Sequence, residues 1–278
     1  MNLRQEAFFL PVAGGQRLCI WREPATGPIC GRIVHIPAFA EEMNKCRPMT
    51  ALVARRVAEC GFGVLEIDLL GCGDSSGDFG GASWEDWIDD VVAAIEWSSQ
   101  RGGAPLWLWG TRAGALLASA VTHRIAQVTS LLLWQPVLSG RTHLTQFLRL
   151  KLAAEIFADG ATGGGTKALR AQLQQGAGME IAGYRLSPEL ASGMDAAEFA
   201  VADTIAEVVW LEVTTATPPG VSPASQSIVD GLCARGKHVQ AQAVQGPGFW
   251  QSVETEMAPA LVEATVAAMA SEGVHVHA

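Results

Sequence analysis

The chain has 278 residues, of which 49% are hydrophobic, and a mean hydropathy of +0.21, so it carries enough apolar material for a large buried core. Its net charge of -9, without a basic run, argues against nucleic acid as a partner, because such a field repels phosphate backbones. The first residues lack the features of a secretory signal, and no segment reaches the ~18 consecutive apolar residues of a membrane span. We therefore expect a cytoplasmic protein without a membrane span.

Regular elements are predicted along most of the chain. It opens with an antiparallel hairpin, because the apolar runs 6–12 and 16–23 flank the turn 13–15. Further strands are predicted from short, continuously apolar runs at 31–36, 62–69, 104–110, 131–136, 208–213 and 238–244. Helices are predicted from apolar residues at helical spacing and from N-terminal Ser or Pro signals over 48–60, 83–98 and 254–270.

Continuous apolar strands separated by helices are typical of a parallel sheet that helices cover on both faces. The predicted fold class is therefore α/β, with a mostly parallel central sheet. The alternation breaks between residues 137 and 207, where an amphipathic helix is predicted over 143–158. We interpret 137–207 as a cap insertion, and 1–136 together with 208–278 as the core. The Thr/Pro-rich run 214–225 is interpreted as a loop.

The metal-ligating residue types are scattered. The six cysteines have no C-x-x-C spacing, which indicates buried thiols rather than a disulfide or zinc framework. The histidines lack the spacing of a zinc site as well. Ser75 and Ser76 are interpreted as residues that form turn hydrogen bonds. We expect neither a metal ion nor an organic cofactor.

The run WLWGTRAGALLAS (107–119) predicts a buried strand, a tight glycine turn and a helix of small residues. A strand, turn and helix of this kind resembles the nucleophile elbow of α/β hydrolases, in which Gly-X-Ser-X-Gly carries the catalytic serine. The order of elements resembles the α/β-hydrolase fold over almost the whole chain. Two further segments agree with it: IPAF (36–39), where these proteins place the oxyanion loop, and DLLGCGDS (68–75).

Five segments together resemble a narrower family, the exosortase A system-associated hydrolase 2 family. These segments are HIPAFAEEMNKCRPM, DLLGCGDSSGDF, LWGTRAGALLA, MEIAGYRLS and QGPGFWQS. The resemblance implies a protein that accompanies the machinery for sorting PEP-CTERM proteins in bacteria that produce exopolysaccharide. It also implies an α/β-hydrolase fold.

The residues at the three triad positions do not support serine chemistry. The elbow reads Gly110-Thr-Arg-Ala-Gly114, and the guanidinium of Arg112 stays protonated, so it is no nucleophile. The usual histidine aligns with Phe249, in Gly-Pro-Gly-Phe, and a phenylalanine accepts no proton. Where an aspartate is expected after the strand 208–213, the chain reads TTATPPG, and Glu212 within that strand is the acidic residue nearby.

Arg112 itself suggests two hypotheses. A cation at a helix N-terminus is disfavoured by ~0.3 to 1 kcal/mol unless a nearby anion pairs with it. The first hypothesis is a purely structural role, in which Arg112 forms a salt bridge to Glu41 or Glu42, with Asp74 as a further candidate partner. The sharper hypothesis is an anion site for a carboxylate or phosphate, and the two can coexist if the ligand displaces the internal carboxylate. The residues assigned to this ligand site are Arg112, Ala113, Thr111, Phe39, Glu41, Glu42, His35 and Trp250.

Three functions remain open at this point. The leading hypothesis is a binding or accessory protein for a small anionic or acyl ligand, under a cap with the apolar residues Phe147, Leu148, Leu150, Ile156 and Phe157. The same apolar residues also suit packing of the cap onto the sheet, and we favour packing as their role. The alternative is a hydrolase of esters or thioesters in which His35, with Glu41 or Glu42, activates water beside Arg112. A third hypothesis is a structural module that forms a homodimer.

Overall fold

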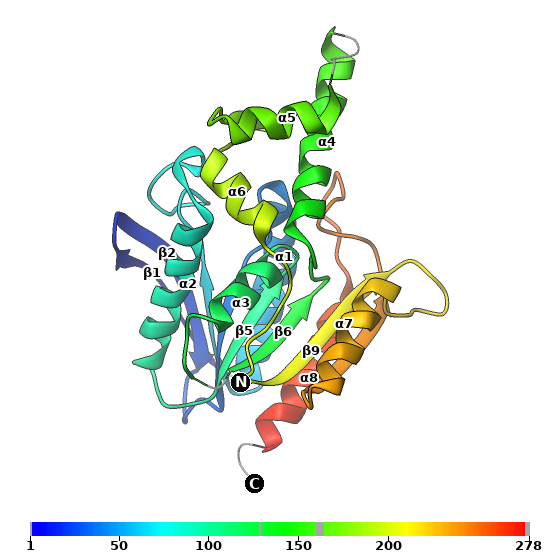
Figure 1. Ribbon diagram of the computed structural model, residues 1–278. Coiled ribbons are helices and arrows are strands. Elements are labelled where there is room, and N and C mark those ends of the chain that lie inside the picture. Colours follow the sequence, from blue (N-terminus) through cyan, green and yellow to red (C-terminus); the bar gives the residue numbers. More distant parts are fainter. Residues whose placement is uncertain (1, 128, 160–163, 276–278) are drawn as a thin grey trace.

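The computed structural model describes residues 2–127, 129–159 and 164–275, and within them one sheet of eight strands runs through the molecule (Figure 1). In spatial order the strands are β1 (Leu3–Val12), β2 (Gly15–Pro24), β4 (Phe62–Ile67), β3 (Gly31–Ile36), β5 (Leu106–Thr111), β6 (Thr129–Trp134), β9 (Ile205–Thr214) and β10 (His238–Gln245). The hairpin of β1 and β2 joins β4 in antiparallel fashion, and the remaining neighbours pair in parallel. The predicted mostly parallel sheet is confirmed.

Helices cover both faces of the sheet. On one face lie α1 (Glu41–Glu59) and α8 (Pro259–His275), which contact each other; on the other lie α2 (Trp84–Ser99), α3 (Gly114–Thr122) and α7 (Pro223–Ala234). Strand β5 shows why its sequence is apolar throughout. Leu106 and Leu108 pack toward α2 and α3, whereas Trp107 and Trp109 pack toward α1.

Residues 137–207, predicted as a cap insertion, contain α4 (Gly140–Asp159), α5 (Gly165–Gln174), the small hairpin of β7 (Met179–Ile181) and β8 (Tyr184–Leu186), and α6 (Pro188–Ala196). Figure 1 shows α4, α5 and α6 above the ends of β5 and β6, with α4 extending away from the core. The three helices contact one another, and α6 also contacts α2. This arrangement places the start of α4 over the turn that follows β5.

The first helix begins earlier than its sequence pattern predicts. The prediction started it at Pro48, but α1 starts at Glu41 and holds Pro48 in its interior. Glu41 and Glu42 lie in the first turn, where acidic side chains interact favourably with the helix dipole. Ala40, just before them, has a φ of 52°, so the chain turns sharply from the loop after β3 into the helix. As a result, both glutamates lie on a helix rather than in a loop.

Other element ends follow local capping signals. Ser83 and Asp86 form a reciprocal capping box at the start of α2, as the sequence predicted. Helix α8 starts at Pro259, inside the predicted range 254–270, and proline suits the first position of a helix. The predicted loop 214–225 is shorter than expected, because the Ser222 hydroxyl accepts a hydrogen bond from Ser225 and caps α7.

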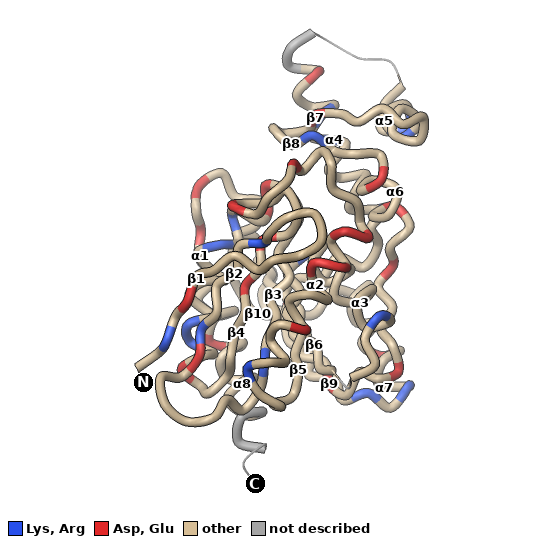
Figure 2. The backbone as a smooth tube through the Cα atoms, turned by 90° about the vertical axis from the view of Figure 1, so that its left-hand side faces the viewer, with Lys and Arg blue, Asp and Glu red and all other residues tan. Residues whose placement is uncertain are grey.

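Charged residues are spread over the core and the cap (Figure 2). All six cysteines are free, and four of them are buried. Among the residues that the structure describes, no helix combines the length and the apolar character needed to cross a lipid bilayer.

Candidate functional site

The turn between β5 and α3 holds Arg112 at its tip. Arg112 has a φ of 54°, a left-handed conformation that costs roughly 1–3 kcal/mol in a residue other than glycine and is concentrated at functional sites. The flanking glycines leave no room for side chains. A Cβ on Gly110 would lie 2.6 Å from the Ala115 Cα, and one on Gly114 would lie 2.3 Å from the Ile36 carbonyl oxygen. The glycine spacing of the predicted elbow is therefore required by packing.

The Arg112 guanidinium is held from three sides. Its Nη2 and Nε donate hydrogen bonds to the Glu42 carboxylate, at 2.9 and 3.2 Å, and Nη1 donates to the Gln135 carbonyl at 3.3 Å. The guanidinium carbon lies 4.9 Å from the centre of the Trp250 ring, within the range of a cation–π contact. The side chains of Arg112 and Glu42 are 15% and 14% exposed. Of the three predicted partners, Glu42 is thus the one that pairs with Arg112.

A cavity of about 520 Å³ lies beside this ion pair, between the elbow, α1, α4 and the segment after β10. Four of its lining residues are apolar: Phe39, Phe147, Leu150 and Trp250. The other eight are polar: Glu41, Glu42, Lys45, Arg112, His143, Gln146, Gln251 and Ser252. The ion pair therefore forms part of the wall and does not fill the space.

Two residues that line this cavity each carry a buried polar atom that has no hydrogen-bond partner among the described residues. One is Oε2 of Glu41, and burial raises the pKa of that carboxyl, with a smaller contribution from the Glu42 carboxylate. The other is Nδ1 of His143, a residue that is only 5% exposed. Burial lowers the pKa of His143, which keeps the ring neutral. The Glu42 carboxylate raises this pKa and the Arg112 guanidinium lowers it, both by less than burial does. Buried polar atoms without partners are uncommon and call for an explanation.

Phe249, which the sequence analysis aligned with the usual histidine, and Glu212, the acidic residue near the expected aspartate position, both have structural contacts. Phe249 is buried after β10, with its ring 5.3 Å from Trp250 and 6.2 Å from Trp134. Glu212 is buried in β9, and its carboxylate accepts hydrogen bonds from the Trp210 indole at 3.1 Å and from the Ser222 backbone at 2.9 Å. Glu212 thus fixes the loop that leads into α7.

The structure gathers five of the eight predicted site residues around the cavity: Phe39, Glu41, Glu42, Arg112 and Trp250. Thr111, Ala113 and His35 do not line it. Thr111 still belongs to β5, where its hydroxyl lies 3.2 Å from the His35 Nε2 on the neighbouring strand. Burial lowers the pKa of His35 to about 3, and the ring packs edge-on against Trp109. The His35 ring therefore lies in the core and does not line the cavity beside Arg112.

Several lining residues were not predicted as site residues, and His143 is the most informative of them. The sequence indicated an amphipathic cap helix beginning at His143, but it could not show that the helix begins at Gly140 and places His143 over the elbow. Of the predicted apolar cap residues, Phe147 and Leu148 are buried, whereas Leu150 and Ile156 are 43% and 59% exposed. The side chain of Phe157 lies outside the described residues. The cap residues therefore serve both packing and the cavity wall.

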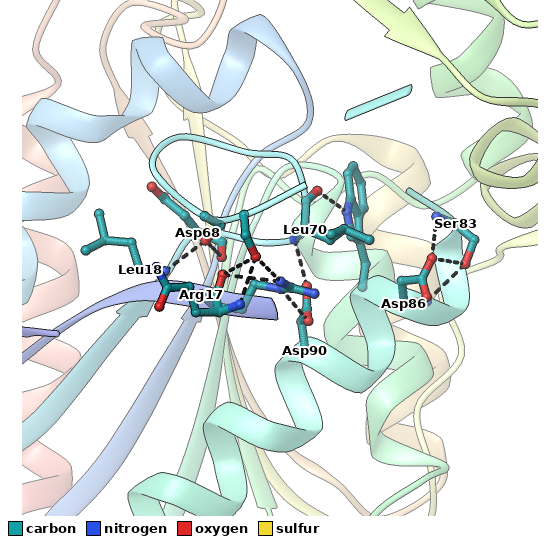
Figure 3. A network of polar contacts seen from close by, with 11 residues as sticks. Arg17, Leu18, Asp68, Leu70, Ser83, Asp86 and Asp90 are labelled. Carbon is teal, nitrogen blue, oxygen red and sulfur yellow. Dashed lines mark hydrogen bonds and ion pairs between the residues drawn. The ribbon is translucent and has the colours of Figure 1, made fainter. Parts of the chain in front are cut away.

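The glycine-rich segment after β4 forms a second polar network, shown in Figure 3. Arg17 and Asp90 face each other there, with 2.6 Å between Nε and Oδ1, and the second Asp90 oxygen accepts a hydrogen bond from the Leu70 backbone at 2.7 Å. Ser75 donates to the Asp68 carbonyl within the segment, whereas Ser76 donates to the Gln16 carbonyl of β2 and so links the segment to that strand. This network anchors the segment to β2 and α2.

The cap contains another cavity of about 520 Å³, between α4, α5 and α6. Its arginine, Arg170, is already bonded to Asp195, to the Arg141 carbonyl and to the Thr145 hydroxyl. In the described part of the chain, no three His, Cys, Asp or Glu side chains gather as a metal site would require. The cavity beside Arg112 therefore remains the candidate site.

Solved structures with the same architecture come from several organisms. Est1E from Butyrivibrio proteoclasticus, with ferulic acid bound, is 14% identical over 97% of this chain and 98% of that chain, with a TM-score of 0.60. GrgF from Penicillium sp. sh18, an α/β hydrolase, is 14% identical over 99% of both chains, with a TM-score of 0.59. A fungal esterase from Rhizomucor miehei is 14% identical over 99% of this chain and 85% of that chain, with a TM-score of 0.59. At these identities the likeness shows the α/β-hydrolase fold alone.

No curated protein matches the sequence. A family model, in contrast, does match it. Residues 28–177, more than half of the 278-residue chain, match the family described as serine aminopeptidase, S33, and this range includes the elbow, the ion pair and the start of the cap. The chain therefore belongs to the serine aminopeptidase S33 family of α/β hydrolases.

Proposed function

We propose that this member of the family binds a small anionic or acyl ligand at the former catalytic centre and does not hydrolyse esters through a Ser-His-Asp triad. The observation that carries the proposal is the Arg112–Glu42 pair at the tip of the elbow, beside a cavity of about 520 Å³. A cavity of this size lies within the usual range of roughly 300–1,000 Å³ for small-molecule sites.

The chemistry of the three triad positions supports a binding role. A guanidinium stays protonated and supplies no nucleophile, and the Phe249 ring accepts no proton. The Glu212 carboxylate is already engaged by Trp210 and Ser222. A lone substitution in a working esterase would leave the other two positions intact, and here all three differ.

Arg112 retains donors for a ligand. Of the five N–H groups of a guanidinium, the contacts of Arg112 with Glu42 and Gln135 use one on each of the three nitrogens, so two N–H groups remain. A carboxylate or phosphate oxygen can accept these two without breaking the ion pair, or it can replace the Glu42 carboxylate. Phe39, Phe147 and Leu150 offer an apolar wall for the remainder of the ligand.

The resemblance to the exosortase A-associated family supports a setting for this role. We propose that the protein serves exosortase-dependent sorting of PEP-CTERM proteins as an accessory protein. Deleting its gene from a bacterium with this system should impair PEP-CTERM sorting, and the wild-type gene should restore it. Restoration by an Arg112→Met gene at the wild-type level would contradict a role for the ligand site.

Calorimetry with ferulate tests the binding role. Ferulate is the carboxylate that Est1E binds, and its neutral methyl ester is a matched ligand without the charge. We expect the wild type to bind ferulate more tightly than methyl ferulate. Glu42→Gln should bind ferulate more tightly still, because the internal competitor for Arg112 loses its charge. Adding Arg112→Met to Glu42→Gln should weaken ferulate binding about tenfold or more, since hydrogen bonds to charged groups contribute ~1.5–3 kcal/mol.

A matched control and a covalent probe complete the test. Arg124→Met removes an exposed arginine that pairs with Glu85 and should leave ferulate binding unchanged. A fluorophosphonate should label no serine, and methyl ferulate should not be hydrolysed. Labelling of a cavity residue such as Ser252, or turnover of methyl ferulate that Arg112→Met abolishes, would overturn the proposal.

A further inference from the structure

A second basic side chain, that of His143 on the cap helix α4, lines the cavity beside Arg112. We propose that His143 is the second anchor of an anionic head group, and that binding of the anion is coupled to the uptake of one proton by its imidazole. The inference rests on the proposed function, because it concerns how the same site holds its ligand.

The position of His143 supports this role. It lies in the first turn of α4, is 5% exposed, and lines the cavity together with Arg112. Its ring stands edge-on to Phe39, with 5.9 Å between ring centres, so the orientation of the imidazole is fixed by packing. Its Nδ1 has no hydrogen-bond partner among the described residues. A fixed, buried imidazole with an unused nitrogen can gain a hydrogen bond without losing one.

The charged groups around His143 explain why a ligand would change its charge. Arg112 from the elbow and Glu42 from α1 act on it in opposite directions, and they are paired with each other. Glu41 and Lys45, also on α1, line the same cavity, while the segment after β10 contributes only the neutral residues Trp250, Gln251 and Ser252. Burial is therefore the dominant influence in the free protein, and it keeps the imidazole neutral. An anion bound in the cavity adds a negative charge near the imidazole and so favours its protonated form.

The chemical class of the ligand follows from this pair of anchors. One oxygen of the anion accepts the spare N–H groups of Arg112, and a second accepts the N–H of the imidazolium. A carboxylate or a phosphate monoester offers two such oxygens, whereas an ester or an alcohol does not. The ligand is thus a carboxylic or phosphoric acid whose remainder contacts the apolar wall.

The pH dependence has a definite sign. In the free protein the pKa of His143 is below its usual value of about 6.5, and the bound anion raises it. Between the free and bound values, binding takes up one proton, so the affinity increases about tenfold for each unit by which the pH falls. Above the bound-state pKa the ring is neutral in both states, and the affinity no longer depends on pH.

The test is calorimetric titration of the full-length protein with ferulate from about pH 5.5 to 8, where its carboxylate is ionised. Titrations in two buffers of different ionisation enthalpy count the protons taken up. We expect an uptake that approaches one proton as the pH falls, and about tenfold tighter binding per unit in that window. His143→Gln should bind ferulate without proton uptake and without this slope. The control His123→Gln, whose histidine bonds the Ala200 carbonyl at an exposed position, should keep the wild-type slope.

The outcomes separate the two proposals. Ferulate binding that is independent of pH in the wild type, or an unchanged slope in His143→Gln, overturns the role of His143 and leaves the binding function standing. Absence of binding by the wild type at every pH, with ferulate and with inorganic phosphate, overturns both. If His143→Gln does not fold, the proton count of the wild type decides alone: an uptake of zero contradicts the inference.

Discussion

Two arginine–carboxylate pairs of this protein are both directly hydrogen-bonded, but they differ in what surrounds them. In the network of Figure 3, the Arg17 and Asp90 side chains are each 3% exposed, and both Asp90 oxygens accept hydrogen bonds. The Arg112 and Glu42 side chains are 15% and 14% exposed. Beside them lie a cavity of about 520 Å³ and two buried polar atoms without partners, on Glu41 and His143.

An ion pair alone therefore does not distinguish a structural network from a binding site. A pair whose partners are satisfied holds segments together, as Arg17 and Asp90 do for the glycine-rich segment. A pair that borders empty space and unsatisfied groups leaves hydrogen-bonding capacity for a ligand. Each prediction below tests whether the two pairs differ in this way.

The largest effect is expected at Asp90. Asp90→Ala leaves the buried Arg17 guanidinium without its anion, and breaking a buried pair in this way costs about 3 to 5 kcal/mol of unfolding free energy. Urea denaturation measures the loss. Asp89→Ala, at the exposed neighbouring position, is the matched control and should change stability little. Under conditions where the Asp90 variant is folded, it should bind ferulate as the wild type does; weakened binding would show that the two pairs are not separate.

A second effect distinguishes the two buried histidines. His35 has a pKa of about 3 in the folded protein and about 6.5 when unfolded, so below about pH 6.5 the unfolded chain binds a proton that the folded one does not. Stability should therefore fall by about 1.4 kcal/mol per pH unit as the pH decreases from 6.5. His143 acts in the same direction.

His35→Gln should make this acid dependence shallower, as measured by urea denaturation between about pH 5 and 6.5. His238→Gln, at a histidine side chain that is 75% exposed, is the control. His35 does not line the cavity, so His35→Gln should leave the pH dependence of ferulate binding intact. A changed pH dependence of ferulate binding in His35→Gln would show that the proton taken up on binding belongs to His35 and not to His143.

The smallest effect is expected at Glu42. In Glu42→Gln the amide oxygen can still accept from Arg112, and the guanidinium borders a cavity, so the variant should lose only about 1 kcal/mol. The double variant Glu42→Leu, Arg112→Met replaces the whole pair with apolar side chains and should regain most of that loss. Urea denaturation of the three proteins checks this order. A loss in Glu42→Gln as large as that in Asp90→Ala would make Arg112 a structural plug.

The sequence predicted the sheet and the elbow well because those features follow from short-range steric rules. Gly110 and Gly114 flank a turn that has no space for a Cβ, and β5 is apolar throughout because both of its faces are buried. The start of α1 was predicted less well. The rule that places proline at the beginning of a helix outweighed the acidic pair Glu41 and Glu42, which marks the true first turn.

The amino-acid sequence places an arginine at the elbow tip and a phenylalanine after the last strand, and it offers Glu41, Glu42 and Asp74 as candidate partners of the arginine. Only the tertiary structure decided which glutamate pairs with Arg112, that His35 turns toward Thr111 in the core, and that His143 reaches the cavity from the cap. The physical reason is the range of the interactions. Backbone sterics and helix dipoles act between neighbours in sequence, whereas the cavity is formed by segments that meet only when the cap packs over the carboxyl ends of the strands.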